Sequence, residues 1–247
     1  MMSDKKYGFI ADMHTHTLAS THAYSTITEN ALWASEHGIK YLGMTDHGID
    51  MQDAPDTWHF ENLRILPDYI HGVRIIRGIE ANIVDSNGKI DIYHNYVYDS
   101  LEWVNVSFHP QVYMPSDKAS HTKAYIGALN NPRVDVICHS EDKRYPYDID
   151  EVTRACAEYG KLIELNVGRL GRNNGSDRLY EPILEACEKH GTGIIVNSDA
   201  HFYTKIGEFG QAIELLERTG FPEKLIVNSN EERFKNYYNS RNLKGKI

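Results

Sequence analysis

Cysteine is scarce in this 247-residue sequence, and its pattern excludes two kinds of stabilising site. The 3 cysteines, Cys138, Cys156 and Cys187, are odd in number, widely spaced and form no CxxC pair. Neither a disulfide framework nor a structural zinc site of the cysteine type fits this spacing. The cysteine pattern therefore favours a reducing compartment.

Long apolar runs and excess positive charge are also missing. No apolar stretch approaches the roughly 20 residues that a membrane helix needs. Residues 1–12 lack the apolar core of a signal peptide, so we expect a cytoplasmic protein with no membrane partner. The net charge of −9 works against a broad nucleic-acid surface, although a small local anion site fits this composition. The sequence is compatible with a homo-oligomer.

The length suits one α/β barrel, which commonly has about 250 residues. Short β-branched runs alternate with amphipathic helical patterns, which is the order expected of a parallel sheet. The predicted strands are 7–12, 41–45, 74–78, 104–108, 134–138, 162–166 and 193–197. Predicted helices include 29–37, 150–159, 177–190 and 206–219. We therefore predict a single domain over residues 1–247, folded as a distorted seven-unit (βα)7 TIM-like barrel.

Local signals mark several ends of these elements. Thr28 and Ser176 are candidate helix N-caps, while Gly38, Gly160 and Gly191 follow three helices as stop signals. Residues 85–88, Asp-Ser-Asn-Gly, predict a hairpin turn after the third strand.

Residues that can bind metal recur at or just past the ends of six predicted strands, and one more lies in a loop. Active sites form at this end of such barrels. Imidazole and carboxylate ligands suit zinc, manganese or iron. The nine candidates are His14, His16, His22, His47, Glu80, His109, His139, Asp199 and His201.

A single histidine at a strand end is more often a core or loop residue than a ligand. We assign the remaining histidines His37, His71, His94, His121 and His190 to that class. His59 is a candidate substrate contact. Glu80 has an alternative role as an ion-pair partner of Arg77, but a bridging ligand is favoured. Cys138 is expected to point away from His139 and to pack as a small apolar residue.

The segment Asp12-Met13-His14-Thr15-His16 resembles the D-x-H-x-H motif that opens the PHP (polymerase and histidinol phosphatase) superfamily. The similarity is closest to the YcdX-like phosphatases. It extends through residues 19–26, 45–48, 51–55, 77–82 and 198–201, and so covers nearly the whole chain. The resemblance implies a distorted seven-unit barrel with three metal ions, usually zinc and sometimes manganese or iron.

The resemblance also implies how the ligands are shared. One ion would take His14, His16, Glu80 and Asp199. A second would take Glu80, His109 and His139, and a third His22, His47 and His201. Glu80 would then bridge two ions. The sequence departs from the family at Ser140-Glu141, which stand after His139 where the family usually has Pro-Gly.

Three divalent ions carry six positive charges, of which Glu80 and Asp199 offset two, so such a site attracts an anion. We therefore predict a phosphatase for small phosphomonoesters with a metal-bound hydroxide as nucleophile. Asp12 or Asp46 would orient ligand histidines. Arg169, Arg172 or Lys118 would contact the phosphoryl group.

Three alternatives remain open at this stage. An amidohydrolase-type C–N hydrolase would also begin with H-x-H, but it needs a bridging lysine where Glu80 and His109 stand. A 3′-end nuclease or phosphodiesterase would need a basic groove, and the basic residues here are scattered. A catalytically silent, metal-stabilised binding module is disfavoured by the complete ligand set.

Overall fold

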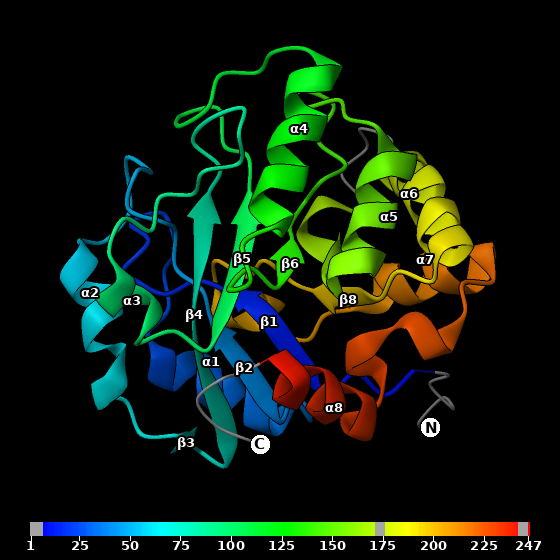
Figure 1. Ribbon diagram of the computed structural model, residues 1–247. Helices are drawn as coiled ribbons and strands as arrows, with labels where there is room; N and C mark the ends of the chain where they lie inside the picture. The colour runs from blue at the N-terminus through cyan, green and yellow to red at the C-terminus, as the bar shows by residue number, and fades with distance from the viewer. Residues whose placement is uncertain (1–6, 171–175, 242–246) are drawn as a thin grey trace.

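The computed structural model describes residues 7–170, 176–241 and 247. Its centre is a nearly closed barrel of seven parallel strands in the order β1-β2-β4-β5-β6-β7-β8 (Figure 1). The short β3 (Tyr69–Ile70) pairs antiparallel with β4. The predicted seven-unit α/β barrel is confirmed. The parallel strands are β1 (Ala11–Thr15), β2 (Tyr41–Met44), β4 (Val73–Asn82), β5 (Trp103–Ser107), β6 (Val136–Ile137), β7 (Leu162–Asn166) and β8 (Ile194–Asn197).

Eight α-helices occur in the described part of the chain, and α4, α5 and α6 follow one another around the outside of the barrel (Figure 1). None of the described helices combines the length and the apolar character of a membrane span. The helices are α1 (Ile27–Glu36), α2 (Thr57–Asn62), α3 (Asn95–Tyr98), α4 (Lys118–Leu129), α5 (Ile149–Tyr159), α6 (Ser176–His190), α7 (Gly210–Thr219) and α8 (Glu231–Arg241).

The barrel is distorted where its first and last strands meet. At the carboxyl end, β1 and β8 are joined by an isolated parallel bridge between Thr15 and Ala200. Deeper down, the Asn228 side chain fills the seam: its Nδ2 donates to the carbonyls of Ala11 (2.8 Å) and Val196 (2.7 Å). Side-chain hydrogen bonds thus join β1 and β8 here, and Asn197 adds another by accepting from Met13 N–H (2.9 Å).

Alternate residues along the strands pack into two separate apolar clusters. One cluster takes residues from all seven parallel strands, such as Met13, Ile76 and Leu162, and is joined by Phe234 and Tyr238 of α8. It is therefore the barrel interior. The other cluster combines the opposite strand faces with the surrounding helices. Near the carboxyl ends of the strands, the side chains on this same interior face therefore point into the barrel mouth.

Most predicted elements are confirmed, with shifted ends. The first strand was predicted at 7–12 but runs over Ala11–Thr15, so it includes His14. Thr28 is not a cap: α1 begins one residue after Thr26, whose hydroxyl accepts from the Glu29 N–H in a capping box. The side chain of Ser176 lies outside the described residues, so that cap stays a prediction.

The predicted helix stops and hairpin are confirmed. Gly38, Gly160 and Gly191 all have positive φ just after α1, α5 and α6. The turn at 85–88 closes with Gly88 N–H donating to Asp85 O (3.1 Å). Gly88 is required here, because a Cβ would lie 2.2 Å from the backbone nitrogen of Ala128. The hairpin thereby packs directly on α4.

Candidate metal centre

Strand periodicity brings some of the candidate residues to the mouth. Ile76 belongs to the barrel interior, so Glu80, four residues along β4, continues the same face. Trp103 and Leu162 are interior in the same way and place Ser107 and Glu164 on that face. Glu80 and Glu164 are both almost fully buried. Two carboxylates thus stand inside the open end of the barrel.

Departures from regular strand geometry turn other candidates inward. The β1–β2 pairing is irregular between Asp12 and Thr15, and His14 lies within this irregularity. His139 and Asp199 have φ of 32° and 55°, and both lie two residues past a strand. A left-handed backbone at a non-glycine residue costs about 1–3 kcal/mol and concentrates at functional sites. Here it directs both side chains into the mouth.

The Glu80 carboxylate lies at the centre of the imidazoles. Its Oε1 is 2.8 Å from His139 Nε2 and 3.6 Å from His109 Nε2. Its Oε2 is 3.3 Å from His14 Nε2, 3.3 Å from His47 Nε2 and 3.6 Å from His16 Nε2. The two oxygens therefore face two different sets of rings, which is the geometry expected of a bridging carboxylate.

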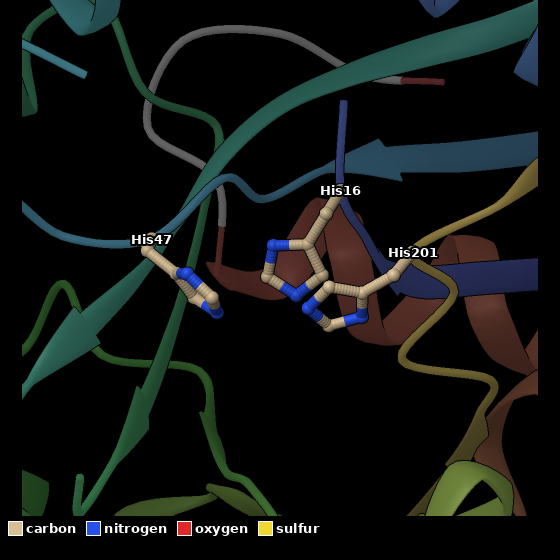
Figure 2. A group of neighbouring side chains, drawn as sticks. All are labelled: His16, His47 and His201. Atoms are coloured by element: carbon tan, nitrogen blue, oxygen red, sulfur yellow. The ribbon is translucent and has the colours of Figure 1, made fainter. Parts of the chain in front are cut away.

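Asp199 and His201 complete the far side of the cluster. Asp199 Oδ1 is 3.1 Å from His16 Nε2 and 3.4 Å from His14 Nε2. The rings of His16, His47 and His201 converge from three separate segments (Figure 2), and their ligand atoms lie within 4.8 Å of one another. His22 stacks on His201 with ring centroids 4.4 Å apart. All nine predicted ligands are thus brought to one end of the barrel.

The expected division of the ligands among three ions stays a prediction. In the sets expected around His14 and around His139, the rings lie near Glu80 or Asp199. In the expected third set, however, His22 is half-exposed and its Nδ1 lies 2.5 Å from Asp53. His16 is the ring that stands with His47 and His201 in the described geometry.

A second layer of polar groups lies within hydrogen-bond distance of Nδ1 atoms of the clustered imidazoles. His14 Nδ1 lies 2.7 Å from Glu164, and His109 Nδ1 lies 2.8 Å from the Asn82 amide oxygen. His22 and His47 share Asp53, and His201 Nδ1 is 2.9 Å from the Asp199 carbonyl. A proton held on Nδ1 leaves the Nε2 lone pair for a cation, the usual arrangement around protein-bound metals.

The electrostatics of the cluster fit a cation. Burial opposes ionisation of Glu80, but the surrounding imidazoles, His14 first among them, outweigh it and hold the Glu80 pKa well below its usual range. Burial lowers the pKa of His16 to about 4 and that of His109 to about 3. At His14 and His47 nearby carboxylates outweigh burial: Glu164 and Glu80 hold the His14 pKa well above its usual value, and Glu80 raises the His47 pKa to about 9. His14 Nε2, His201 Nε2 and Glu80 Oε2 are buried without a hydrogen-bond partner. Bound divalent cations would satisfy these atoms.

The predicted supporting carboxylates have different surroundings. Asp46 accepts from the Ser20 hydroxyl (2.8 Å), which in turn lies 3.4 Å from His16 Nδ1. The hydrogen bonds of Asp12 come from the backbone N–H groups of Ser198 and Gly207. Asp46 thus reaches a candidate ligand through one hydroxyl, whereas Asp12 holds the loop that carries Asp199.

Three of the four candidate substrate contacts fall within the described residues, and they lie in different surroundings. Arg169 lines a cavity of about 180 Å³ at the mouth together with Glu80, Asp199 and Arg144. Lys118 lies elsewhere, with its Nζ 2.9 Å from Asp148. Arg172 lies outside the described residues. His59 Nε2 is 3.3 Å from Asp46, which places this ring behind the Asp46 carboxylate.

The residues that flank His139 in the sequence are buried. Cys138 is buried in the barrel interior, and its sulfur lies within 4.8 Å of ligand atoms of His14 and Glu164. The expected packing of Cys138 as a small apolar residue is confirmed, and the direction of its side chain relative to His139 stays a prediction. Glu141, which replaces the usual glycine, is buried and accepts from the Tyr180 hydroxyl (2.7 Å).

The five histidines set aside from the sequence lie away from this cluster. His121 is buried and contacts Ser116 N and Pro146 O, and His190 pairs with Asp150. His37 stacks on Trp33, and His94 stacks on Tyr96. His71 occupies a turn at positive φ.

Sequence reasoning missed four residues that support the cluster: Ser20, Asp53, Asn82 and Glu164. A signal for Glu164 was present, since it is the one carboxylate in the otherwise apolar or amide strand Leu-Ile-Glu-Leu-Asn. A charged residue in a strand buried on both faces needs a partner, and His14 is that partner. Ser20, Asp53 and Asn82 lie in loops or at strand ends, and the sequence gives no comparable signal for them.

A parallel barrel with imidazoles and carboxylates gathered at its carboxyl end defines a class, the TIM-like barrels with a candidate multi-metal centre. The PHP domain family matches residues 12–240, and the chain belongs to this family. It is 42% identical to a probable phosphatase of Acetivibrio thermocellus over 93% of this chain and 95% of that protein. It is 40% identical to a probable phosphatase of Caldanaerobacter subterraneus, over 96% and 94% of the two chains.

A solved structure shows the same fold at low sequence identity. The histidinol phosphate phosphatase of Lactococcus lactis, in complex with zinc, L-histidinol and phosphate, aligns with a TM-score of 0.61. Identity is 17%, and the alignment covers 86% of this chain and 94% of that one. This similarity confirms the barrel architecture.

Proposed function

We propose that the chain is a metal-dependent phosphatase that hydrolyses phosphomonoesters at a site for three divalent ions. Membership of the PHP family supports this proposal, as do the names of the similar probable phosphatases. The zinc and phosphate in the histidinol phosphate phosphatase structure support the choice of cofactor and substrate class. Zn²⁺ suits the imidazole-rich ligand set best, and Mn²⁺ or Fe²⁺ are the alternatives.

One observation carries the proposal. Five imidazole Nε2 atoms lie within 3.6 Å of the Glu80 carboxylate, and the Nδ1 atoms of His14, His47 and His109 face other polar groups. Such a cluster of imidazoles around a buried carboxylate is costly to maintain without cations, because apolar residues of similar volume often pack with equal or greater stability.

The proposed ligand sets are those that the resemblance to the PHP family implies. His14, His16, Glu80 and Asp199 would hold one ion, and Glu80, His109 and His139 a second. His22, His47 and His201 would hold the third, with His16 nearest to that group in the described geometry. When bound, the ions supply a hydroxide nucleophile near neutral pH, by lowering a water pKa to about 7, and offset the phosphoryl charge.

The chain's own residues supply positioning. Glu164 orients His14, Asn82 orients His109, and Asp46 acts on His16 through Ser20. Arg169 is half-buried beside Asp199, on the wall of the mouth cavity. We assign it to a phosphoryl oxygen, since a guanidinium matches two such oxygens at once. The proposed substrate is a small phosphorylated metabolite of the cytoplasm.

The test compares two substrate classes on one preparation. Protein loaded with zinc, manganese or iron is assayed for phosphate release from a panel of phosphomonoesters and for degradation of single-stranded DNA. Both assays are run at low and physiological salt, because nucleic-acid binding depends steeply on salt. We expect monoester turnover, inhibition by free phosphate and little DNA cleavage. Degradation of DNA far faster than every monoester would replace the phosphatase proposal by a nuclease.

Elemental analysis gives an independent check of the centre. The proposed ligand sets require two to three transition-metal ions per folded chain. A well-folded preparation that holds less than one ion, and takes up none when metal is added, would contradict the proposed centre.

A further inference from the structure

A second, larger cavity opens beside the mouth of the barrel. It has a volume of about 1140 Å³, compared with about 180 Å³ for the mouth cavity. The two cavities share His22, Arg169, Asp199 and His201 on their walls. The larger cavity therefore adjoins the proposed metal centre and has room for the leaving group of a phosphomonoester bound there. We call it the leaving-group cleft.

Exposed aromatic rings line this cleft next to the candidate ligands. Tyr24 is 68% exposed and follows His22 by two residues, while Phe202 is 43% exposed and follows His201 directly. Leu170 and Phe209 are buried and form apolar wall. Single exposed aromatic residues are ordinary, but two in one concave site beside a reaction centre indicate a binding surface.

The same backbone fixes the rings and the candidate ligands. Tyr24 N–H donates to His201 O (2.9 Å), and Tyr203 N–H donates to Ser25 Oγ (2.8 Å). The loop after β1 is thus tied to the loop after β8. The two rings are held near the cluster by these loops, so a ligand loses little loop entropy on binding.

The charged side chains of the cleft do not favour the binding of a second anion. Lys205 lies in the cleft with its Nζ 3.0 Å from Glu208, which lines the same space. The remaining polar lining includes the amide of Gln211. A leaving group with no charge of its own and a flat ring fits this combination of paired charges and exposed aromatic faces.

We propose that the cleft selects phosphomonoesters whose leaving group carries an uncharged planar ring, and that Tyr24 and Phe202 are the specificity-determining residues. This inference rests on the proposed phosphatase function and specifies its substrate class. Stacking of a flat ring on an aromatic side chain adds to the apolar contact that any bulky group would make.

The experiment uses three substrates whose alkoxide leaving groups have similar reactivity: ethyl phosphate, 2-cyclohexylethyl phosphate and 2-phenylethyl phosphate. We expect kcat/KM of the metal-loaded enzyme to be at least about tenfold higher for the phenyl compound than for ethyl phosphate. The cyclohexyl compound should fall between them, since it has the bulk without the flat face. Equal values for the cyclohexyl and phenyl compounds, or for all three, would overturn the inference and leave the phosphatase function standing.

Substitutions of the two aromatic residues test whether they cause the preference for the phenyl compound. Phe202→Leu and, as a second variant, Tyr24→Leu keep an apolar side chain but remove the ring. Each should reduce the phenyl-to-cyclohexyl ratio, mainly through KM, because the ring contact forms already in the ground state. The matched control is Tyr159→Leu on α5, whose tyrosine is also 43% exposed but lies outside the cleft. An unchanged ratio in both folded cleft variants would contradict the assignment.

Binding of phosphonates separates the two proposals. Calorimetry with 2-phenylethylphosphonate and ethylphosphonate measures the cleft without any turnover. If no monoester is hydrolysed but the phenyl compound still binds at least about tenfold more tightly, the phosphatase function falls and the cleft preference stands. Equal binding of the two phosphonates would overturn the cleft preference.

Discussion

Glu164→Gln tests the idea that the second layer of polar groups builds the metal centre. Glu164 is fully buried on β7 and accepts four hydrogen bonds. Its Oε1 lies 2.7 Å from His14 Nδ1 and 2.9 Å from Asn197 Nδ2. Its Oε2 receives His139 N–H (2.9 Å) and Asn166 Nδ2 (3.0 Å). Glutamine keeps the shape but replaces one acceptor oxygen by a donor.

The magnitude follows from these contacts. Whichever way the new amide turns, two buried donors lose their acceptor, and at about 1–3 kcal/mol each the free energy of unfolding should fall by about 2–6 kcal/mol. Burial opposes ionisation of Glu164, but His14 holds its pKa below the usual value, so the carboxylate charge that fixes the His14 ring is also lost. Loss of such an orienting group typically weakens metal binding by about 10–100-fold.

The assay measures both quantities on the same variant. Urea unfolding of the metal-free protein gives the stability loss, and competition with a chelator gives the metal affinity. The control is Asp135→Asn, because Asp135 is equally buried and accepts from Val104 N and Arg241 Nε, at the opposite end of the barrel. It should lose stability without losing metal affinity. Wild-type metal affinity in Glu164→Gln would refute the reasoning.

Four further outcomes are expected. Glu80→Gln should lose at least one ion and most activity, because the remaining oxygen cannot face both sets of rings; elemental analysis and phosphate release check this. Chelation should lower the thermal midpoint, since His14 Nε2 and His201 Nε2 are buried without partners, and re-addition of metal should restore it. Burial raises the pKa of Asp91 from 3.8 to about 6, so the stability linked to its proton is present below pH 4 and is lost as pH rises through 6. The unfolding free energy of wild type relative to Asp91→Asn should fall by about 3 kcal/mol over that range, and a flat difference would contradict this. Gly88→Ala should destabilise the fold by at least about 2 kcal/mol in urea unfolding, because its Cβ would meet the α4 backbone at 2.2 Å, while metal content stays unchanged.

The barrel was predictable because its signals are local. β-branched runs, the glycines after α1, α5 and α6, and the 85–88 turn each act through a few neighbouring residues. The ends of β1 could not be predicted from the sequence, since the irregular pairing between Asp12 and Thr15 depends on a neighbouring strand. α1 begins after Thr26 because only that residue completes a capping box with Glu29.

The identities of the candidate ligands came from the sequence, since parallel strands must present their carboxyl ends at one edge. Which oxygen faces which ring could not come from it. The inward turns of His139 and Asp199 depend on left-handed backbone conformations, which remain uncommon even for histidine and aspartate, although these residues adopt them more often than most.

The sequence by itself determined a single parallel barrel and nine candidate ligands at one end, because residue type and periodicity act along the chain. Only the tertiary structure decided that Glu164 supports His14 from 150 residues away, that Asn228 fills the β1–β8 seam, and that Tyr24 and Phe202 line one cleft. These contacts join segments far apart in the chain. Their geometry is set by how the barrel closes, and closure depends on all seven strands at once.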